Sequence, residues 1–307
     1  ETPVATMGSC FVVAIRQWLI SNGFNYVSAE TGPGTKQGSA RFGRLFNTGV
    51  LRQIFEHSHG RFNPVEKFWP HDGLLLDPYR QGIAWPNPQS AEIERKIHGE
   101  AVARMTRDAE VLICTVGISE TWRSRDDGSV FHTVPPASAF DPAKHEFSLL
   151  GVEENLANLE ATYNLVREHN PDIQLILTLS PVPLGMTFRD MSVVCADMVS
   201  KSMLRVAIDM FIEQHPEVVY FPAFELVRRM VPEPFMEDWR HVKPALVCAI
   251  MARFMTHFGS PGEVYQTPID LAAYMQASSA SSDAGAAQEN GAPKAAHDSK
   301  TNAVGAA

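Results

Sequence analysis

Three residues near the two ends of the chain have the types needed for nucleophilic catalysis. Ser9 follows a glycine and precedes a predicted helix, so free backbone N–H groups at the helix start would face its hydroxyl. Asp238 and His241 are three residues apart, a spacing that lets a carboxylate hold Nδ1–H of the imidazole while Nε2 faces outward. These residues form a candidate triad: Ser9 attacks, His241 is the general base and then the acid, and Asp238 orients the imidazole.

Each of these residues also has a simpler interpretation. Ser9 alone could be the N-cap of the helix, and Asp238 with His241 could be a surface or capping pair. Cys10 could itself be a nucleophile, because a thiol at a helix N-terminus can have a lowered pKa, but we expect it to turn inward as a buried structural cysteine. Lys201 falls within a predicted helix, and we expect a solvated or helix-capping charge there.

A metal site is an alternative source of chemistry. His57 and His59, with His71 and Asp72 nearby in the sequence, are ligand types that zinc, copper and iron accept. Neighbouring histidines at a helix end commonly compensate the helix dipole or are exposed, so this interpretation is less favoured. A metal-dependent enzyme of this kind would lose its activity to chelators and would be unaffected by Ser9→Ala.

The elements that must position these residues alternate between strands and helices. Short apolar runs at 110–115, 173–179 and 217–221 predict strands that are buried on both faces, with weaker candidates at 3–7 and 25–29. Such alternation predicts right-handed βαβ units and a mostly parallel sheet, whose ligands bind at the carboxyl ends of the strands. Helices are predicted at 10–21, 48–57, 91–108, 152–169, 197–214 and 243–257, and irregular segments at 31–46, 60–90 and 119–151 are expected to form the rim of the cleft.

The composition and the charge of the chain exclude several classes of protein and partner. A chain of 307 residues that is 45% hydrophobic can build a sizeable core, and its net charge of −9 argues against nucleic acid as a partner. No apolar run approaches the roughly 20 residues of a membrane span, and no signal peptide is visible, so we expect a cytoplasmic protein. Four widely spaced cysteines are consistent with a reducing compartment. We expect one domain over 1–276, followed by a flexible Ala-, Ser- and Gly-rich tail over 277–307.

Several motifs in order resemble the GSCFA-domain family, which is named for its opening motif and looks related to the SGNH, or GDSL-type, esterases and lipases. The similarity runs from Gly8 to about position 257 and includes the final Asp238-x-x-His241. The motifs are GSCFV at 8–12, TVGISETW at 115–122, LSPVP at 179–183, VSKS at 199–202, YFPAFE at 220–225 and DWRH at 238–241.

The resemblance implies a three-layer α/β/α, flavodoxin-like SGNH fold with a serine nucleophile and no metal or organic cofactor. Ser9 matches the nucleophile of that superfamily, and Asp238 and His241 match its Asp-x-x-His. Gly117 matches the glycine of the Gly-x-Asn-Asp block, but Ser119 and Glu120 stand where that block has Asn and Asp. Loss of one oxyanion donor can remove about 2.7–4 kcal/mol of transition-state stabilisation.

Other residues could supply the missing contacts. Asn47 lines up with an asparagine that the family commonly places before a helix, although it could simply cap that helix. Gly43 or Gly49 could donate a backbone N–H to the oxyanion, and His132, which resembles a family histidine preceding a proline, could touch substrate.

The residues and the resemblance together predict an ester hydrolase, or an acyl or acetyl transferase, with an acyl-enzyme on Ser9. An acylated carbohydrate is the preferred substrate, because Trp69, Tyr79, Trp85 and Trp122 in the predicted rim could stack on sugar rings. The alternative is a binding or regulatory module that keeps the scaffold without efficient catalysis, because a fold does not imply a function.

Overall fold

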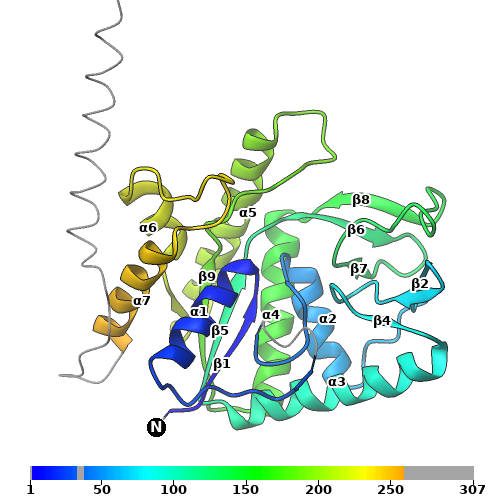
Figure 1. Ribbon diagram of the computed structural model, residues 1–307, viewed down its shortest axis with the longest axis horizontal. Coiled ribbons are helices and arrows are strands. Elements are labelled where there is room, and N and C mark those ends of the chain that lie inside the picture. The colour runs from blue at the N-terminus through cyan, green and yellow to red at the C-terminus, as the bar shows by residue number, and fades with distance from the viewer. Residues whose placement is uncertain (1, 33–37, 259–307) are drawn as a thin grey trace, which may run out of the picture.

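A four-stranded parallel sheet forms the centre of the protein. The computed structural model describes residues 2–32 and 38–258, so the tail predicted at 277–307 lies outside the described residues. The strands are β1 (Val4–Gly8), β5 (Val111–Val116), β9 (Gln174–Leu179) and β10 (Val219–Tyr220), in the spatial order β1-β5-β9-β10 (Figure 1). All three pairings are parallel, which places the carboxyl ends of the strands at one edge.

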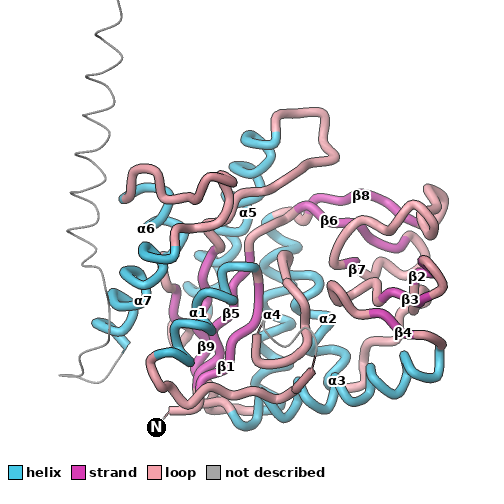
Figure 2. The backbone as a smooth tube through the Cα atoms, in the orientation of Figure 1, coloured by secondary structure: helices cyan, strands magenta, loops and turns pink. Residues whose placement is uncertain are grey.

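Helices cover both faces of this sheet (Figure 2), which confirms the predicted three-layer α/β/α fold. One layer packs its apolar side chains, such as Phe11 and Leu246, onto one core of the sheet. The other layer packs on a second core through side chains such as Phe55 and Phe211. The first layer comprises α1 (Cys10–Ser21), α6 (Ala223–Met230) and α7 (Pro244–Phe258), and the second comprises α2 (Thr48–Ser58), α3 (Pro88–Asp108), α4 (Val152–His169) and α5 (Val193–Gln214).

The extended segment around Tyr26 lies beside β1 without forming a full strand. Val4 donates its N–H to Asn25 O (2.9 Å) and accepts from the N–H of Val27 (2.9 Å), which makes a single parallel bridge between Val4 and Tyr26. The prediction of a strand at 25–29 was therefore wrong beyond this one bridge. Counted as a rudimentary strand, the segment completes the strand order 2-1-3-4-5, which is the flavodoxin-like order.

Two small antiparallel sheets occupy segments that the sequence predicted as irregular. One contains β2 (Trp69–His71), β3 (Leu74–Leu76) and β4 (Ala84–Trp85); the other contains β6 (Glu120–Ser124), β7 (Val130–Phe131) and β8 (His145–Leu149). Strands of two to five residues carry too short an alternating pattern to be distinguished from loops. The helix α6 was also missed, and the strand predicted at 217–221 pairs over two residues only.

The rim aromatic residues are mostly buried, which corrects the expectation that they stack on a sugar. Trp69 (1% exposed) and Tyr79 (5%) pack with Phe131, and Trp85 (4%) packs in a separate cluster. Trp122 is partly buried and makes edge contacts with three phenylalanine rings. These four side chains hold the small sheets together.

Within the described residues, none of the helices combines the length and the apolar character that crossing a membrane requires.

Candidate active site

Ser9 lies in the sharp turn between β1 and α1. Gly8 has φ +139°, and a Cβ at this position would overlap the backbone of Thr115 on the neighbouring strand, so only glycine fits. Ser9 is the N-cap of α1, and its Oγ accepts from the N–H of Phe11 (3.3 Å). Thr115 Oγ1 lies 2.7 Å from Ser9 N and 2.9 Å from Ser9 Oγ. The side chain is therefore held at the carboxyl edge of the sheet and is only 2% exposed.

Asp238 and His241 lie in a tight loop between α6 and α7, and the structure brings them together. The loop is closed by an antiparallel bridge between Phe235 and Val242. Asp238 Oδ1 accepts the backbone N–H groups of Arg240 (3.0 Å) and His241 (2.9 Å), while Oδ2 lies 2.5 Å from His241 Nδ1. These contacts fix the carboxylate against the imidazole, as the spacing predicts.

The pair has the orientation that a general base requires. Hydrogen bonds from the His241 side chain and then from the two backbone N–H groups lower the pKa of Asp238 to about 2, so its carboxylate stays ionised. An ionised carboxylate accepts hydrogen bonds, so Nδ1 of His241 carries a hydrogen and Nε2 lies on the side of the ring away from Asp238. The imidazole is half exposed, which leaves Nε2 accessible to a reacting group.

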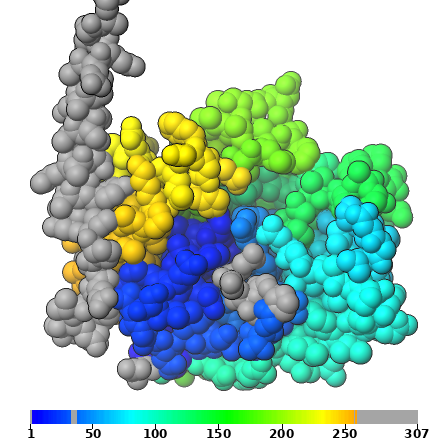
Figure 3. Space-filling model, viewed as in Figure 1, coloured from blue at the N-terminus to red at the C-terminus, as the bar shows by residue number. Residues whose placement is uncertain are grey.

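Ser9 and His241 lie at the same edge of the sheet but are not hydrogen-bonded to each other. Arg240, next to His241, packs against Gly185, and its charge acts on the thiol of Cys10, next to Ser9. In Figure 3 the loop that contains Asp238 and His241 (yellow) adjoins the N-terminal segment (blue). Ser9 Oγ bonds to Thr115 instead of His241. Two members of the predicted triad therefore form a pair, and the third lies nearby with another partner.

Cys10 packs against the core beneath α1, as expected for a structural thiol. Burial raises the pKa of this thiol, although the nearby cations Arg44, Arg240 and Lys201 act in the opposite direction. A raised pKa disfavours the thiolate and so argues against Cys10 as a nucleophile.

Lys201 is the main residue at this edge that sequence reasoning misjudged. Its side chain is 1% exposed, not solvated, and its Nζ donates to the carbonyl oxygens of Gly117 (2.7 Å), Ser180 (2.8 Å) and Val182 (2.9 Å). Burial lowers the pKa of Lys201 to about 8. The ammonium group thus joins the segments that follow β5 and β9. The sequence signal for the burial of Lys201 is its position amid the apolar face of a predicted helix.

The two candidate oxyanion residues at the start of α2 have structural partners. Asn47 is the N-cap of α2: its Oδ1 accepts the N–H of Val50 (2.9 Å), and its Nδ2 donates to Thr121 Oγ1 (3.3 Å). Gly49 lies in the first turn of the helix, where a Cβ would come within 3.0 Å of the side chain of Val130. The helix-cap interpretation describes the observed contacts of Asn47, and Gly49 permits close packing of α2 on β7.

The candidates that follow β5 are also hydrogen-bonded inside the protein. The N–H of Gly117 donates to Phe46 O (2.8 Å). Ser119 accepts at Oγ from Asn155 (3.3 Å), donates from Oγ to Ser200 O (3.2 Å) and donates from its backbone N–H to Ser200 Oγ (2.5 Å). These groups connect β5 to α4 and α5, so an oxyanion would have to displace an existing partner.

Glu120 and His132 contact residues other than Asp238 and His241. Glu120 accepts from Thr187 Oγ1 at both carboxylate oxygens (2.8 and 2.9 Å), so it braces the loop that follows β9. The N–H of His132 donates to Pro78 O, and its ring lies 6.3 Å from that of Trp69, beside the small sheet β2-β3-β4. Burial lowers the pKa of His132 to about 4, so its ring is neutral near pH 7.

The histidines of the metal alternative are dispersed. His57 Nε2 bonds to Arg95 O (2.7 Å), and the ring of His59 stacks on His169 at 3.8 Å. His71 and Asp72 lie at the β2–β3 turn, where His71 Nδ1 contacts Ser138 Oγ (3.0 Å). Among the described residues no group of three or more His, Cys, Asp or Glu side chains is placed to hold a metal ion.

A search of curated proteins finds no match to this sequence. A model of the GSCFA family matches residues 3–254, which span the central sheet, the Ser9 turn and the Asp238–His241 loop. The chain therefore belongs to the GSCFA family.

Proposed function

We propose that this protein is a serine-dependent ester hydrolase, or an acyl or acetyl transferase, of the SGNH type. The observation that carries the proposal is the geometry of Asp238 and His241, in which the carboxylate holds Nδ1 and leaves Nε2 as a base. The position of Ser9 at the β1–α1 turn, at the same edge of the sheet, supports its role as the nucleophile.

In the proposed reaction, Ser9 Oγ forms a bond to the acyl carbon while its proton moves to His241 Nε2. The tetrahedral intermediate collapses, the bond to the leaving alkoxide breaks, and His241 returns the proton to that oxygen. Water or an acceptor hydroxyl then attacks the acyl-enzyme with His241 again as the base, which releases Ser9. Asp238 keeps the imidazole in the reactive tautomer throughout.

Ser9 must change its partner before it can react. Its Oγ leaves Thr115 Oγ1 and turns toward His241, and the exposed loop between α6 and α7 moves to meet it. The positive end of α1 and the cations that act on the neighbouring Cys10 stabilise the negative charge that develops. This environment compensates for the contacts that are lost because Ser119 and Glu120 stand where the Gly-x-Asn-Asp block has Asn and Asp.

The proposed substrate class is a small-molecule ester, with an acetylated carbohydrate as one member of that class. The burial of Trp69, Tyr79 and Trp85 removes the main reason to favour sugars over other esters. A hydrolysis screen should therefore compare short acyl esters with acetylated sugars, each with the wild type and Ser9→Ala.

A fluorophosphonate probe tests the nucleophile directly. We expect the wild type to be labelled, Ser9→Ala to be unlabelled, and His241→Ala to be labelled far more slowly. Ser58→Ala, in which a partly buried serine at the end of α2 is removed, should label as the wild type does. In steady-state assays Ser9→Ala and His241→Ala should be non-additive, because residues that act as a unit fail together.

A binding or regulatory module is the second candidate, and the observed state of Ser9 favours it. Its Oγ is hydrogen-bonded to Thr115 and nearly inaccessible, and no hydrogen bond links it to His241. Such a module predicts no fluorophosphonate labelling and no hydrolysis by well-folded wild-type protein. That result would contradict the proposed enzyme.

A further inference from the structure

A cavity lies between α2, α3 and the segment 60–80, and its lining includes none of Ser9, Asp238 and His241. Its volume is about 430 Å³, within the range of small-molecule sites. Its wall combines apolar side chains, such as Ile54 and Phe62, with a group of charged residues from α3 and the loop before it. The cavity borders the second helical layer, whereas Asp238 and His241 lie between α6 and α7 of the first.

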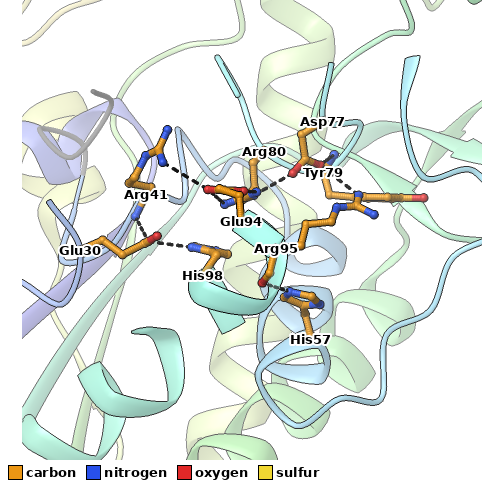
Figure 4. Close-up of polar contacts among 9 residues, drawn as sticks. All are labelled: Glu30, Arg41, His57, Asp77, Tyr79, Arg80, Glu94, Arg95 and His98. Atoms are coloured by element: carbon orange, nitrogen blue, oxygen red, sulfur yellow. Dashed lines mark hydrogen bonds and ion pairs between the residues drawn. The ribbon is translucent and has the colours of Figure 1, made fainter. Parts of the chain in front are cut away.

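Charged side chains behind the cavity wall form a connected network (Figure 4). Arg80 is 3% exposed and donates from Nε to Asp77 (2.8 Å) and from both terminal nitrogens to Glu94 (3.1 and 2.5 Å). Asp77, 2% exposed, also accepts the N–H of Tyr79 (2.9 Å). Three N–H groups of Arg80 are thus hydrogen-bonded to carboxylates within the protein.

Arg95 is a partly buried cation in the cavity wall with only a weak ion pair. Its closest acidic partner is Asp77 at 3.5 Å, which is a long contact for a charged pair. The guanidinium lies 5.4 Å from the ring of Trp85 and 5.7 Å from that of Tyr79, and these rings orient its planar fork. Such a fork matches a carboxylate or a phosphate, so an anionic group fits beside Arg95.

The charged residues nearer the solvent balance one another, with two lysines and two glutamates. Lys67 and Lys96 line the cavity, and neither forms an ion pair within the described part of the chain. Glu92 and Glu100 line it as well and lie on the exposed face of α3. In the interior wall Asp77 is shared between Arg80 and the more distant Arg95, and Glu94 also pairs with Arg80.

His98 supplies a buried hydrogen-bond acceptor in the same wall. Its ring is 2% exposed, and Nδ1 lies 2.7 Å from Glu30 Oε2. Burial lowers the pKa of His98 to about 4, so the ring is neutral near pH 7, Nδ1–H donates to Glu30, and Nε2 keeps its lone pair. Nε2 has no hydrogen-bond partner among the described residues.

Two observations place the ring of His98 beside the cavity. His98 lines the cavity and its partner Glu30 does not, so a part of the ring other than Nδ1 borders the space. His57, whose ring lies 6.5 Å from that of His98 in a stacked arrangement, also lines the cavity and bonds through Nε2 to Arg95 O. A buried acceptor without a partner is costly, and a ligand hydroxyl would satisfy it.

We propose that this cavity is a binding site for a small hydroxylated anion, with a carboxylate or phosphate against Arg95 and a hydroxyl donating to His98 Nε2. The apolar wall around Ile54 and Phe62 covers the carbon skeleton of the ligand. The site is independent of Ser9 and therefore does not require that the protein be an esterase.

Calorimetric titration of the full chain with four probes tests this proposal. Gluconate and glucose 6-phosphate carry hydroxyl groups and a carboxylate or a phosphate, respectively, while glucose lacks the anion and inorganic phosphate lacks the carbon skeleton. We expect saturable binding of at least one hydroxylated anion, at least about tenfold tighter than glucose or inorganic phosphate. The preferred probe distinguishes a carboxylate ligand from a phosphate ligand. Absence of saturable binding of both anions up to about 10 mM overturns the proposal.

Variants on α3 assign the binding to this cavity. Arg95→Gln should weaken the binding of the preferred probe by at least about tenfold. His98→Asn keeps a donor toward Glu30 but removes Nε2, so it should weaken the binding of that probe as well. Arg107→Gln is the matched control, because Arg107 lies in the last turn of the same helix and outside the cavity. If Arg95→Gln does not fold, the double variant Lys67→Gln with Lys96→Gln replaces it, and its binding of the preferred probe should also be weaker than that of the wild type. Unchanged affinity in folded cavity variants contradicts the assignment, as does loss of binding in Ser9→Ala.

Discussion

At the scale of single residues, one carboxylate decides which nitrogen of His241 can act as a base. Asp238 uses one oxygen for two backbone N–H groups and the other for Nδ1, so both the loop and the imidazole tautomer depend on it. An amide at this position could keep the loop contacts through its oxygen, but it could not favour the imidazolium that forms during proton transfer.

Asp238→Asn should therefore lower kcat on the order of 10⁴-fold for an ester substrate, with a much smaller change in substrate binding. Steady-state kinetics measures kcat and KM separately, and circular dichroism of the purified variant checks that it is folded. Glu237→Gln, a change of the same kind at the neighbouring exposed residue, should leave kcat nearly unchanged. A loss of less than about tenfold in Asp238→Asn would argue against a role for this carboxylate in catalysis.

At the scale of secondary-structure elements, two close contacts build the edge of the sheet where Ser9 lies. Gly8 lets β1 approach Thr115 of β5, so the chain can turn into α1 with Ser9 at the cap. Lys201 of α5 holds the segments after β5 and β9 through three carbonyl oxygens. The position of Ser9 thus depends on contacts between elements far apart in the sequence.

Gly8→Ala should reduce the free energy of unfolding by more than the roughly 1–3 kcal/mol expected for a strained backbone alone, because its Cβ also overlaps Thr115. Gly60→Ala is the matched control: Gly60 also has a positive φ (+68°), but a Cβ there meets nothing within 4 Å. Gly60→Ala should reduce the free energy of unfolding by about 1–2 kcal/mol. Equal costs for the two variants in urea unfolding would show that the overlap at Gly8 is relieved without strain.

Lys201→Met should destabilise the protein by about 3 kcal/mol, because it leaves three buried carbonyl oxygens without a donor. Lys144→Met replaces an exposed lysine and should change the stability by less than about 0.5 kcal/mol. Chemical denaturation of both variants makes the comparison. A wild-type stability in Lys201→Met would mean that the segments after β5 and β9 find other donors.

At the scale of the whole molecule, the two helical layers carry different polar chemistry. The first layer and its loops hold Ser9, Asp238 and His241 at the carboxyl edge of the sheet. The second layer and the small sheet β2-β3-β4 enclose a buried ionic network and the cavity beside it. Burial of ionisable groups in this network links the stability of the fold to pH.

His98 makes the protein less stable in mild acid. The pKa of its folded form is about 4, against an ordinary value of 6.5, so the unfolded chain takes up a proton in this interval and the folded chain does not. Stability is therefore lost as the pH falls from 6.5 toward 4, by about 2 kcal/mol between pH 7 and pH 5 from this residue.

Denaturant unfolding of the wild type and His98→Asn at the two pH values measures this contribution. The asparagine keeps a donor toward Glu30 and does not titrate, so the variant should lose about 2 kcal/mol less than the wild type on acidification. An identical loss in both proteins would mean that His98 is protonated in the folded state by pH 5.

The sequence by itself determined the features that depend on neighbouring residues and on burial. Continuous apolar runs predicted β5 and β9, amphipathic spacing predicted α4 with its observed bounds, and a three-residue spacing predicted the Asp238–His241 contact. Tertiary structure alone decided the partner of Ser9, the burial of Lys201 and the network that surrounds Arg80. The physical reason is that these groups are satisfied by partners from distant segments, such as Thr115 for Ser9, and local pattern carries no information about which distant partner is in reach.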